Sequence, residues 1–136
     1  MAWIVPKTDW TAEYCADYED FNRITGNLNH IKEISRRLFS GTASIGVLDD
    51  SKNNLSLIYA SEMNAIENTL ESLNINTYVF DIGKKSTYRA NGSTPLWSEF
   101  NRIESATLLL YETIMSHKKS LTRLAFTLGR QKGITG

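Results

Sequence analysis

Apolar residues recur at spacings of three and four along three stretches of the chain, which is the periodicity of a helix with one buried face. Turn-forming residues separate these stretches, above all over residues 40–55. The spacing predicts helices over about residues 16–39, 58–74 and 95–118. The apolar positions are Phe21, Ile24, Leu28, Ile31 and Leu38 in the first, Met63, Ile66, Leu70 and Leu73 in the second, and Leu96, Phe100, Ile103, Leu110 and Ile114 in the third.

Each predicted helix carries the same short motif near its start: an acid, a large apolar residue, Asn, one variable residue and Ile. The three Asn residues of the motif stand 42 and then 37 residues apart. Three occurrences with the same downstream periodicity indicate duplication of one segment, or one packing solution used three times. The structural motif comprises Phe21, Asn22, Ile24, Met63, Asn64, Ile66, Phe100, Asn101 and Ile103.

The repeated Asn has two interpretations, because Asn is a mediocre helix former and propensity alone does not select it three times. In the structural interpretation, the amide sits beside the apolar stripe and hydrogen-bonds the backbone of an incoming loop or a neighbouring helix. In the functional interpretation, the three amides form a polar cluster that binds a ligand. Buried polar side chains more often specify packing, so the structural interpretation is favoured.

Two further segments alternate apolar and other residues with the period of a β-strand. One contains Tyr78, Phe80 and Ile82, and the other contains Leu124, Phe126 and Leu128. They predict a small β element at about residues 76–90 and 122–129. A chain of 136 residues has the usual size of one domain. The predicted fold is therefore mainly α: a three-helix bundle built from a repeated helix motif, with this β element, in a single domain spanning residues 1–136.

The third helix and the tail after it are the predicted interface. A second apolar strip on this helix makes it either central in the bundle or part of a contact with another molecule. Although the net charge of the chain is zero, residues 1–112 hold all 15 acids and ten of the 15 Lys and Arg, whereas the basic C-terminal segment 117–136 holds the other five. Acidic and basic ends of neighbouring copies are therefore expected to meet in a homo-oligomer. The predicted interface residues are Leu108, Tyr111, Met115, Arg123, Phe126, Arg130 and Lys132.

Nucleic acid is a less favoured partner, because the basic segment lacks a DNA- or RNA-reading motif. Phosphate-binding loops, nucleophile elbows, metalloprotease pairs and dinucleotide fingerprints are missing from the sequence. Cys15 is the single cysteine and excludes an intrachain disulfide framework or a thiolate-rich metal site. Pairing of Cys15 with His30 as a catalytic dyad is the alternative to an ordinary packing role. We expect no enzymatic activity, cofactor, metal or small-molecule substrate. No signal peptide or membrane-spanning run is visible either, so synthesis in the cytoplasm and no membrane partner are expected.

The start of the chain, WIVPKTDW at residues 3–10 followed by DYEDFNRITGNL at residues 17–28, resembles small structural proteins encoded in the tail modules of phages and prophages of Gram-positive bacteria. The similarity continues through FNRIE at residues 100–104 to residue 134. This resemblance implies a non-enzymatic virion component of the tail tip, baseplate, collar or fibre attachment. Such a protein is made in the host bacterial cytoplasm, is present in several copies and binds other phage tail or neck proteins. The alternative is a helical adaptor or regulatory domain that binds a cellular protein or nucleic acid.

Overall fold

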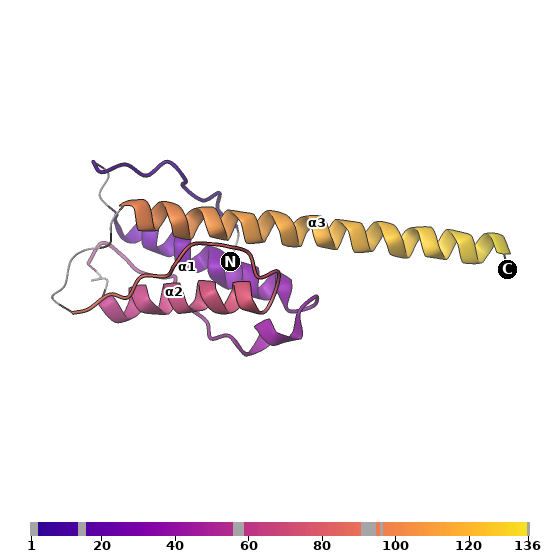
Figure 1. Cartoon of the computed structure of the whole chain (residues 1–136), viewed down its shortest axis with the longest axis horizontal. Coiled ribbons are helices and arrows are strands. Elements are labelled where there is room, and N and C mark those ends of the chain that lie inside the picture. Colours follow the sequence, from indigo (N-terminus) through magenta and orange to yellow (C-terminus); the bar gives the residue numbers. More distant parts are fainter. Residues whose placement is uncertain (1–2, 14–15, 56–58, 91–94, 96, 136) are drawn as a thin grey trace.

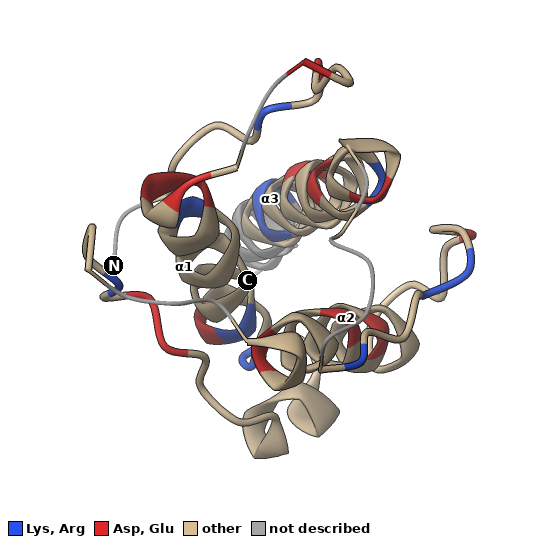
Figure 2. Ribbon diagram, turned by 90° about the vertical axis from the view of Figure 1, so that its left-hand side faces the viewer, with Lys and Arg blue, Asp and Glu red and all other residues tan. Residues whose placement is uncertain are grey.

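In the described part of the chain, three α-helices run in the same direction (Figure 1): α1 (Tyr18–Ser35), α2 (Ala60–Ile75) and α3 (Trp97–Thr135). A short 3-10 helix, η1 (Ser40–Ser44), follows α1. The computed structural model describes residues 3–13, 16–55, 59–90, 95 and 97–135, with side chains up to residue 124. The predicted mainly helical bundle is confirmed, and each helix begins two residues later than the periodicity predicts. Viewed from the side that lies at the left in Figure 1, the helices stand at the corners of a triangle (Figure 2).

Parallel neighbouring helices require the chain to return to the same end of the bundle before each new helix. Extended segments without regular structure make these returns, over residues 45–55 before α2 and residues 76–90 before α3. A third such segment, residues 3–13, precedes α1. The repeating unit of the fold is therefore an extended segment followed by a helix.

Local sequence explains where the helices start. The Asp17 side chain accepts hydrogen bonds from the backbone of Glu19 and Asp20, at 3.0 and 3.1 Å, and the Asp20 carboxylate accepts the backbone N–H of Asp17 in return. This capping box satisfies amides that have no partner inside α1. At α2 the Glu62 carboxylate accepts the backbone N–H of Tyr59 in the same way.

The core lies between the three helices, along the apolar stripes that the sequence predicts. Leu96 of the predicted third stripe lies outside the described residues, and Leu38 and Phe100 are half-buried at the edge of the core. Tyr88 reaches the core from segment 76–90. The buried residues from the helices are Phe21, Ile24, Leu28, Ile31, Met63, Ile66, Leu70, Leu73, Ile103, Ala106, Leu110 and Ile114.

The predicted β element is wrong. Residues 122–129 belong to α3, and residues 76–90 contain no strand. Leu121, Leu124 and Leu128 are also three and four residues apart, so the same leucines fit a helix, and the strand period at Leu124, Phe126 and Leu128 is a coincidence of spacing. Segment 76–90 is extended, but side chains of α2 rather than a partner strand bind its backbone groups.

Helix α3 is far longer than predicted, reaching Thr135 instead of residue 118. The other two helices end at Ser35 and Ile75, so the last part of α3 projects beyond the body of the bundle (Figure 1). We call residues 118–135 the extension. At 1.5 Å per residue it is roughly 27 Å long.

Candidate functional site

Each Asn of the repeated motif binds both backbone groups of one residue in an extended segment. The amide NH2 donates to the carbonyl oxygen of that residue, and the amide oxygen accepts its N–H. We call this arrangement an asparagine clamp. The two distances are 2.7 and 2.8 Å for Asn22 with Lys52, 2.8 and 2.7 Å for Asn64 with Tyr88, and 3.0 and 2.8 Å for Asn101 with Trp10. These hydrogen bonds are those that the structural interpretation of the Asn predicts.

The clamps connect the three repeats in a cycle. Helix α1 clamps the segment that leads into α2, α2 clamps the segment that leads into α3, and α3 clamps the segment that leads into α1. In each unit the clamped residue stands 12 or 13 residues before the Asn of the helix that follows it. The repeated motif therefore marks a structural repeat, in which every unit supplies one clamp and receives one.

Three more clamps have the same geometry and were missed from the sequence. They join Asn27 with Ile4, Asn29 with Leu48 and Asn74 with Phe80, at distances between 2.6 and 3.0 Å. For Asn27 and Asn29 the signal available was Asn in the interior of a predicted helix, where propensity disfavours it; Asn74 stands at the end of one. These three Asn residues lie outside the repeated motif, so the motif does not mark them.

Two buried carboxylates form a second layer beside the clamps. Glu104 stands three residues after Asn101, and Glu67 stands three residues after Asn64; each residue is 1% exposed. The side chain of the clamped residue donates to the carboxylate in both cases. The distances are 2.6 Å from Trp10 Nε1 to Glu104 and 2.9 Å from the Tyr88 hydroxyl to Glu67.

An arginine from the adjacent helix completes each of these sites. Arg23 binds Glu104 with two nitrogens, at 2.7 and 2.9 Å, and also binds Asp20 at 2.8 Å. Arg102 pairs with Glu67. Burial alone would lower the pKa of Arg23, but the hydrogen bonds and charges of Glu104 and Asp20 raise it above its ordinary value. Both carboxylates are thus neutralised inside the protein, as buried charges require.

The junction between α1 and α2, where Asn22 clamps Lys52, lacks both the Arg and the Glu of this pair. The Arg position of the motif is Ala65 in the second repeat, and the Glu position is Thr25 in the first. The clamped residue there is Lys52, and its ammonium group binds Glu62 at 2.6 Å instead of a buried carboxylate. A Glu at position 25 without an Arg at position 65 would be a buried charge without a partner, which is costly. The absence of both charges avoids this cost.

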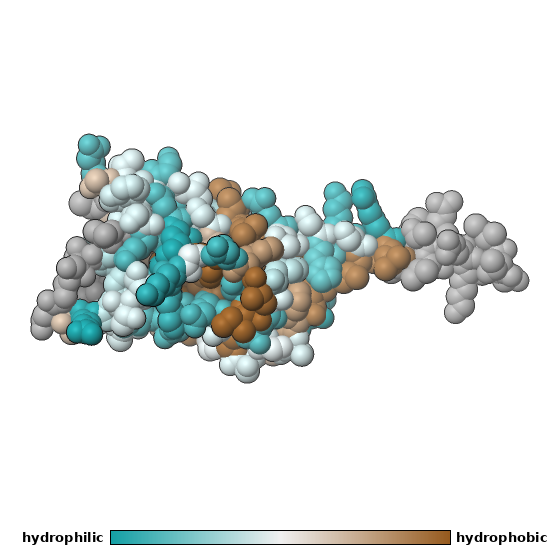
Figure 3. All heavy atoms as spheres, in the orientation of Figure 1, coloured by the Kyte–Doolittle hydropathy of each residue, from teal (hydrophilic) through white to brown (hydrophobic). Residues whose placement is uncertain are grey.

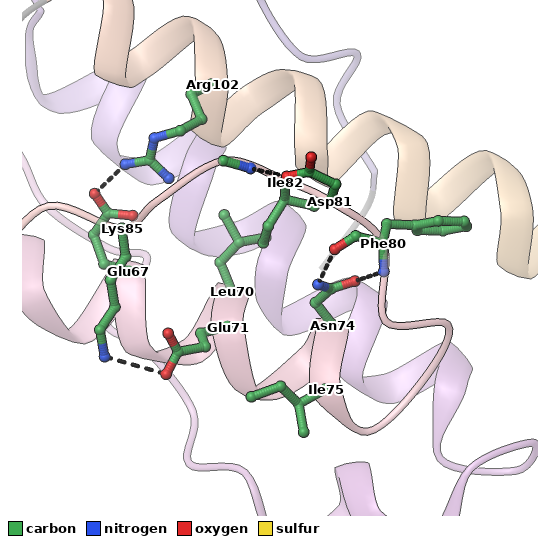
Figure 4. Close-up of a pocket in the computed structure, with 11 residues that line it drawn as sticks. Glu67, Leu70, Glu71, Asn74, Ile75, Phe80, Asp81, Ile82, Lys85 and Arg102 are labelled. Atoms are coloured by element: carbon green, nitrogen blue, oxygen red, sulfur yellow. Dashed lines mark hydrogen bonds and ion pairs between the residues drawn. The ribbon is translucent and has the colours of Figure 1, made fainter.

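A pocket of about 240 Å³ lies between α2, segment 76–90 and Arg102 of α3 (Figure 4). Its lining is mixed: Leu70, Ile75, Phe80 and Ile82 are its apolar residues, and its charged residues include Lys85 and Glu71, which pair at 3.1 Å. Glu67 takes all its hydrogen bonds on Oε2, and Oε1 is buried without a partner in the described part of the chain. Glu67 is thus engaged by its neighbours through Oε2, and Glu71 is engaged by Lys85.

Other candidate chemistry is equally sparse over the described ranges. No three His, Cys, Asp or Glu residues there are grouped to hold a metal ion. Cys15 lies outside them, and the His30 ring packs near the rings of Trp3 and Tyr111, with centroids 6.2 and 6.0 Å away. None of the helices, as far as they are described, has the length and apolarity needed to cross a membrane.

The predicted interface residues have different surroundings. Tyr111 stacks on Trp3 of segment 3–13, with ring centroids 3.8 Å apart and planes 5° from parallel, so the chain itself covers one face of this ring. Leu108 is half-buried, whereas Met115 and Arg123 are exposed. Phe126, Arg130 and Lys132 lie on α3, but their side chains are outside the described part.

Leu121 and Leu124 are exposed apolar residues at the start of the extension, and the sequence-based interface did not include them. The sequence predicts a strand over residues 122–129, so the helical spacing of Leu121, Leu124 and Leu128 is not assigned to the third helix.

Comparison of the chain with protein-family models, with curated proteins and with solved structures finds no match.

Proposed function

We propose that this protein is a non-enzymatic structural component of a phage or phage-like virion, in the tail tip, baseplate, collar or fibre attachment. In this role it forms a homo-oligomer and docks other phage tail or neck proteins. The resemblance of residues 3–10, 17–28 and 100–104 to tail-module proteins supports the proposal. The observation that carries the non-enzymatic part is that buried and half-buried polar side chains serve the fold: six Asn side chains bind backbone, and two buried Glu residues are paired with Arg.

The projecting end of α3 supports an assembly role. A single helix that leaves its bundle with exposed leucines has little stability of its own, because isolated helices of this length are marginal in water. Contact with another protein would bury these leucines and stabilise the helix. The extension therefore suits a component whose structure is completed on assembly.

The test is whether the protein travels with particles. Lysates of the producing bacterium after phage or prophage induction are separated on a density gradient, and the protein is followed with an antibody. We expect it in the particle fractions together with known tail proteins, and lost from them in particles that lack tails. Recovery only in the free-protein fractions would reject the virion assignment.

A helical adaptor or regulatory domain is the second candidate, and the acid-free end of the chain favours it. Residues 113–136 carry five Lys or Arg and no acid, which would attract nucleic acid or an acidic cellular protein. Binding of DNA or RNA that weakens steeply as salt is raised would support this candidate.

A further inference from the structure

The extension continues the apolar stripe by which α3 packs into the body. Leu121 stands seven residues after Ile114, and Leu124 stands fourteen residues after Leu110. Ile114 and Leu110 are fully buried, whereas Leu121 and Leu124 are 42% and 54% exposed. A seven-residue apolar repeat is the pattern of a helix that packs along another surface over its length. The described helices α1 and α2 end too early to cover this part of the stripe.

A second exposed apolar surface lies where α2 ends. Ile75 and Val79 are 59% and 67% exposed, and beside them Phe80 and Ile82 line the pocket described above. We call Ile75, Val79, Phe80, Asp81 and Ile82 the shoulder. Figure 3 shows apolar residues gathered on the visible face of the body and again at the start of the extension. Figure 4 shows the concave part of the shoulder, between α2 and the passing segment.

Charge separates the two ways in which copies could cover these leucines. Pairing of two extensions would bring together two segments that each carry five cations and no acid. Docking of an extension on the body of a second copy instead brings the cations to residues 1–112, which hold 15 acids and ten cations. Opposite net charge favours this second arrangement and speeds encounter.

We propose that the extension of one copy docks on the shoulder of a second copy. Leu121 and Leu124 pack against Ile75 and Val79, with Asp81 beside the contact. Asp81 is exposed and accepts the backbone N–H of Gly83, so its carboxylate is available to a cation from outside. If each copy docks its extension on the next copy, a ring or an open chain forms. If two copies dock their extensions on each other, a closed dimer forms. The inference rests on the proposed assembly function and names the partner surface.

Two neutral double variants test the contact without changing the net charge. The extension variant is Leu121→Gln with Leu124→Gln, and the shoulder variant is Ile75→Gln with Val79→Gln. All four positions are exposed, so circular dichroism is expected to show unchanged helix content. Leu109→Gln, on the same helix at 42% exposure, is the matched control for the extension, and Val47→Gln, at 75% exposure, is the control for the shoulder.

Mass in solution is measured by light scattering after size exclusion at low and high salt. The unaltered chain and both controls are expected to self-associate, more strongly at low salt. Each double variant alone is expected to associate at least about tenfold more weakly. An equal mixture of the two variants is expected to form complexes again, because each keeps the surface that the other has lost.

Three results would overturn the inference. They are an unaltered chain that stays monomeric at low salt, a mixture of variants that does not associate, and a shoulder variant that associates normally while the extension variant does not. The third result would indicate pairing between extensions. The particle assay above is independent: protein found in tailed particles together with any of these results refutes the contact but leaves the virion assignment standing.

Discussion

Replacing a single clamp asparagine measures what the repeated motif contributes to stability. Asn64→Ala removes two hydrogen bonds of 2.8 and 2.7 Å to the backbone of Tyr88. Each is worth about 1 kcal/mol net, which gives about 2 kcal/mol. Ala is a better helix former than Asn by roughly 0.5 kcal/mol, which lowers the expected loss to about 1.5 kcal/mol. If the freed backbone groups stay buried without partners, the loss rises to about 3 kcal/mol.

A matched control exists on the same helix. Asn68 is exposed, and its amide oxygen accepts only a hydrogen bond from Lys85, at 3.0 Å. Asn68→Ala has the same propensity gain and loses a weak surface contact, so its stability should stay within about 0.5 kcal/mol of the parent. The difference between the two variants therefore isolates the clamp.

Urea denaturation followed by circular dichroism gives both free energies of unfolding, provided that the slope with denaturant is unchanged. Amide hydrogen exchange adds a local measurement, because the Tyr88 amide loses its acceptor in Asn64→Ala and should exchange faster. The Phe80 amide N–H donates to the Asn74 side-chain oxygen, which this variant leaves in place. Its protection from exchange should therefore fall only as far as global stability falls. Equal stability of Asn64→Ala and Asn68→Ala, or unchanged exchange at Tyr88, would refute the structural role of the motif.

Further predictions concern the buried side chains. Arg102→Ala leaves the Glu67 carboxylate buried without its cation and should cost roughly 3 kcal/mol, and adding Glu67→Gln should recover part of that loss in a double-mutant cycle measured by urea denaturation. Trp10→Ala, at a side chain that is 2% exposed, should cost about 3 kcal/mol or more, and a loss under 1 kcal/mol would show that segment 3–13 contributes little to the core. Burial, reinforced by Glu67 and Glu99, raises the pKa of Tyr88 above its ordinary value of 10.0. The stabilisation by its protonated hydroxyl is therefore complete below about pH 10 and is lost as the pH rises further. Tyrosinate absorbance should show one tyrosine that ionises only with unfolding, and Tyr88→Phe should remove that step.

The helices could be predicted because their information is local. The buried stripe in each helix repeats every three or four residues, and the capping acid at Asp17 stands next to the helix that it begins. The repeated Asn could be interpreted for the same reason, since propensity alone marks Asn22, Asn64 and Asn101 as unusual. The residues that these Asn side chains bind could not be predicted, because the clamp of Asn101 joins residues 91 apart in the chain.

The errors arose where tertiary contacts decide between local alternatives. Tyr78, Phe80 and Ile82 do alternate along an extended segment, but Asn74 binds the backbone of Phe80 where a neighbouring strand would otherwise do so. Tyr111 looked available for a partner, and its own N-terminal segment covers it with Trp3. Neither contact has a signature within a short window of sequence.

The cyclic order of the clamps has a consequence for the time course of folding. Segment 3–13 is made before the three helices, yet the clamp and carboxylate that hold it, Asn101 and Glu104, belong to α3. During synthesis Trp10 and Arg23 therefore lack their α3 partners until nearly the whole body has left the ribosome. Closure of this long-range contact is expected to be the late step, after the helices have formed locally. A chain cut short before residue 101 would leave the cycle of clamps open, with Trp10 lacking both Asn101 and Glu104.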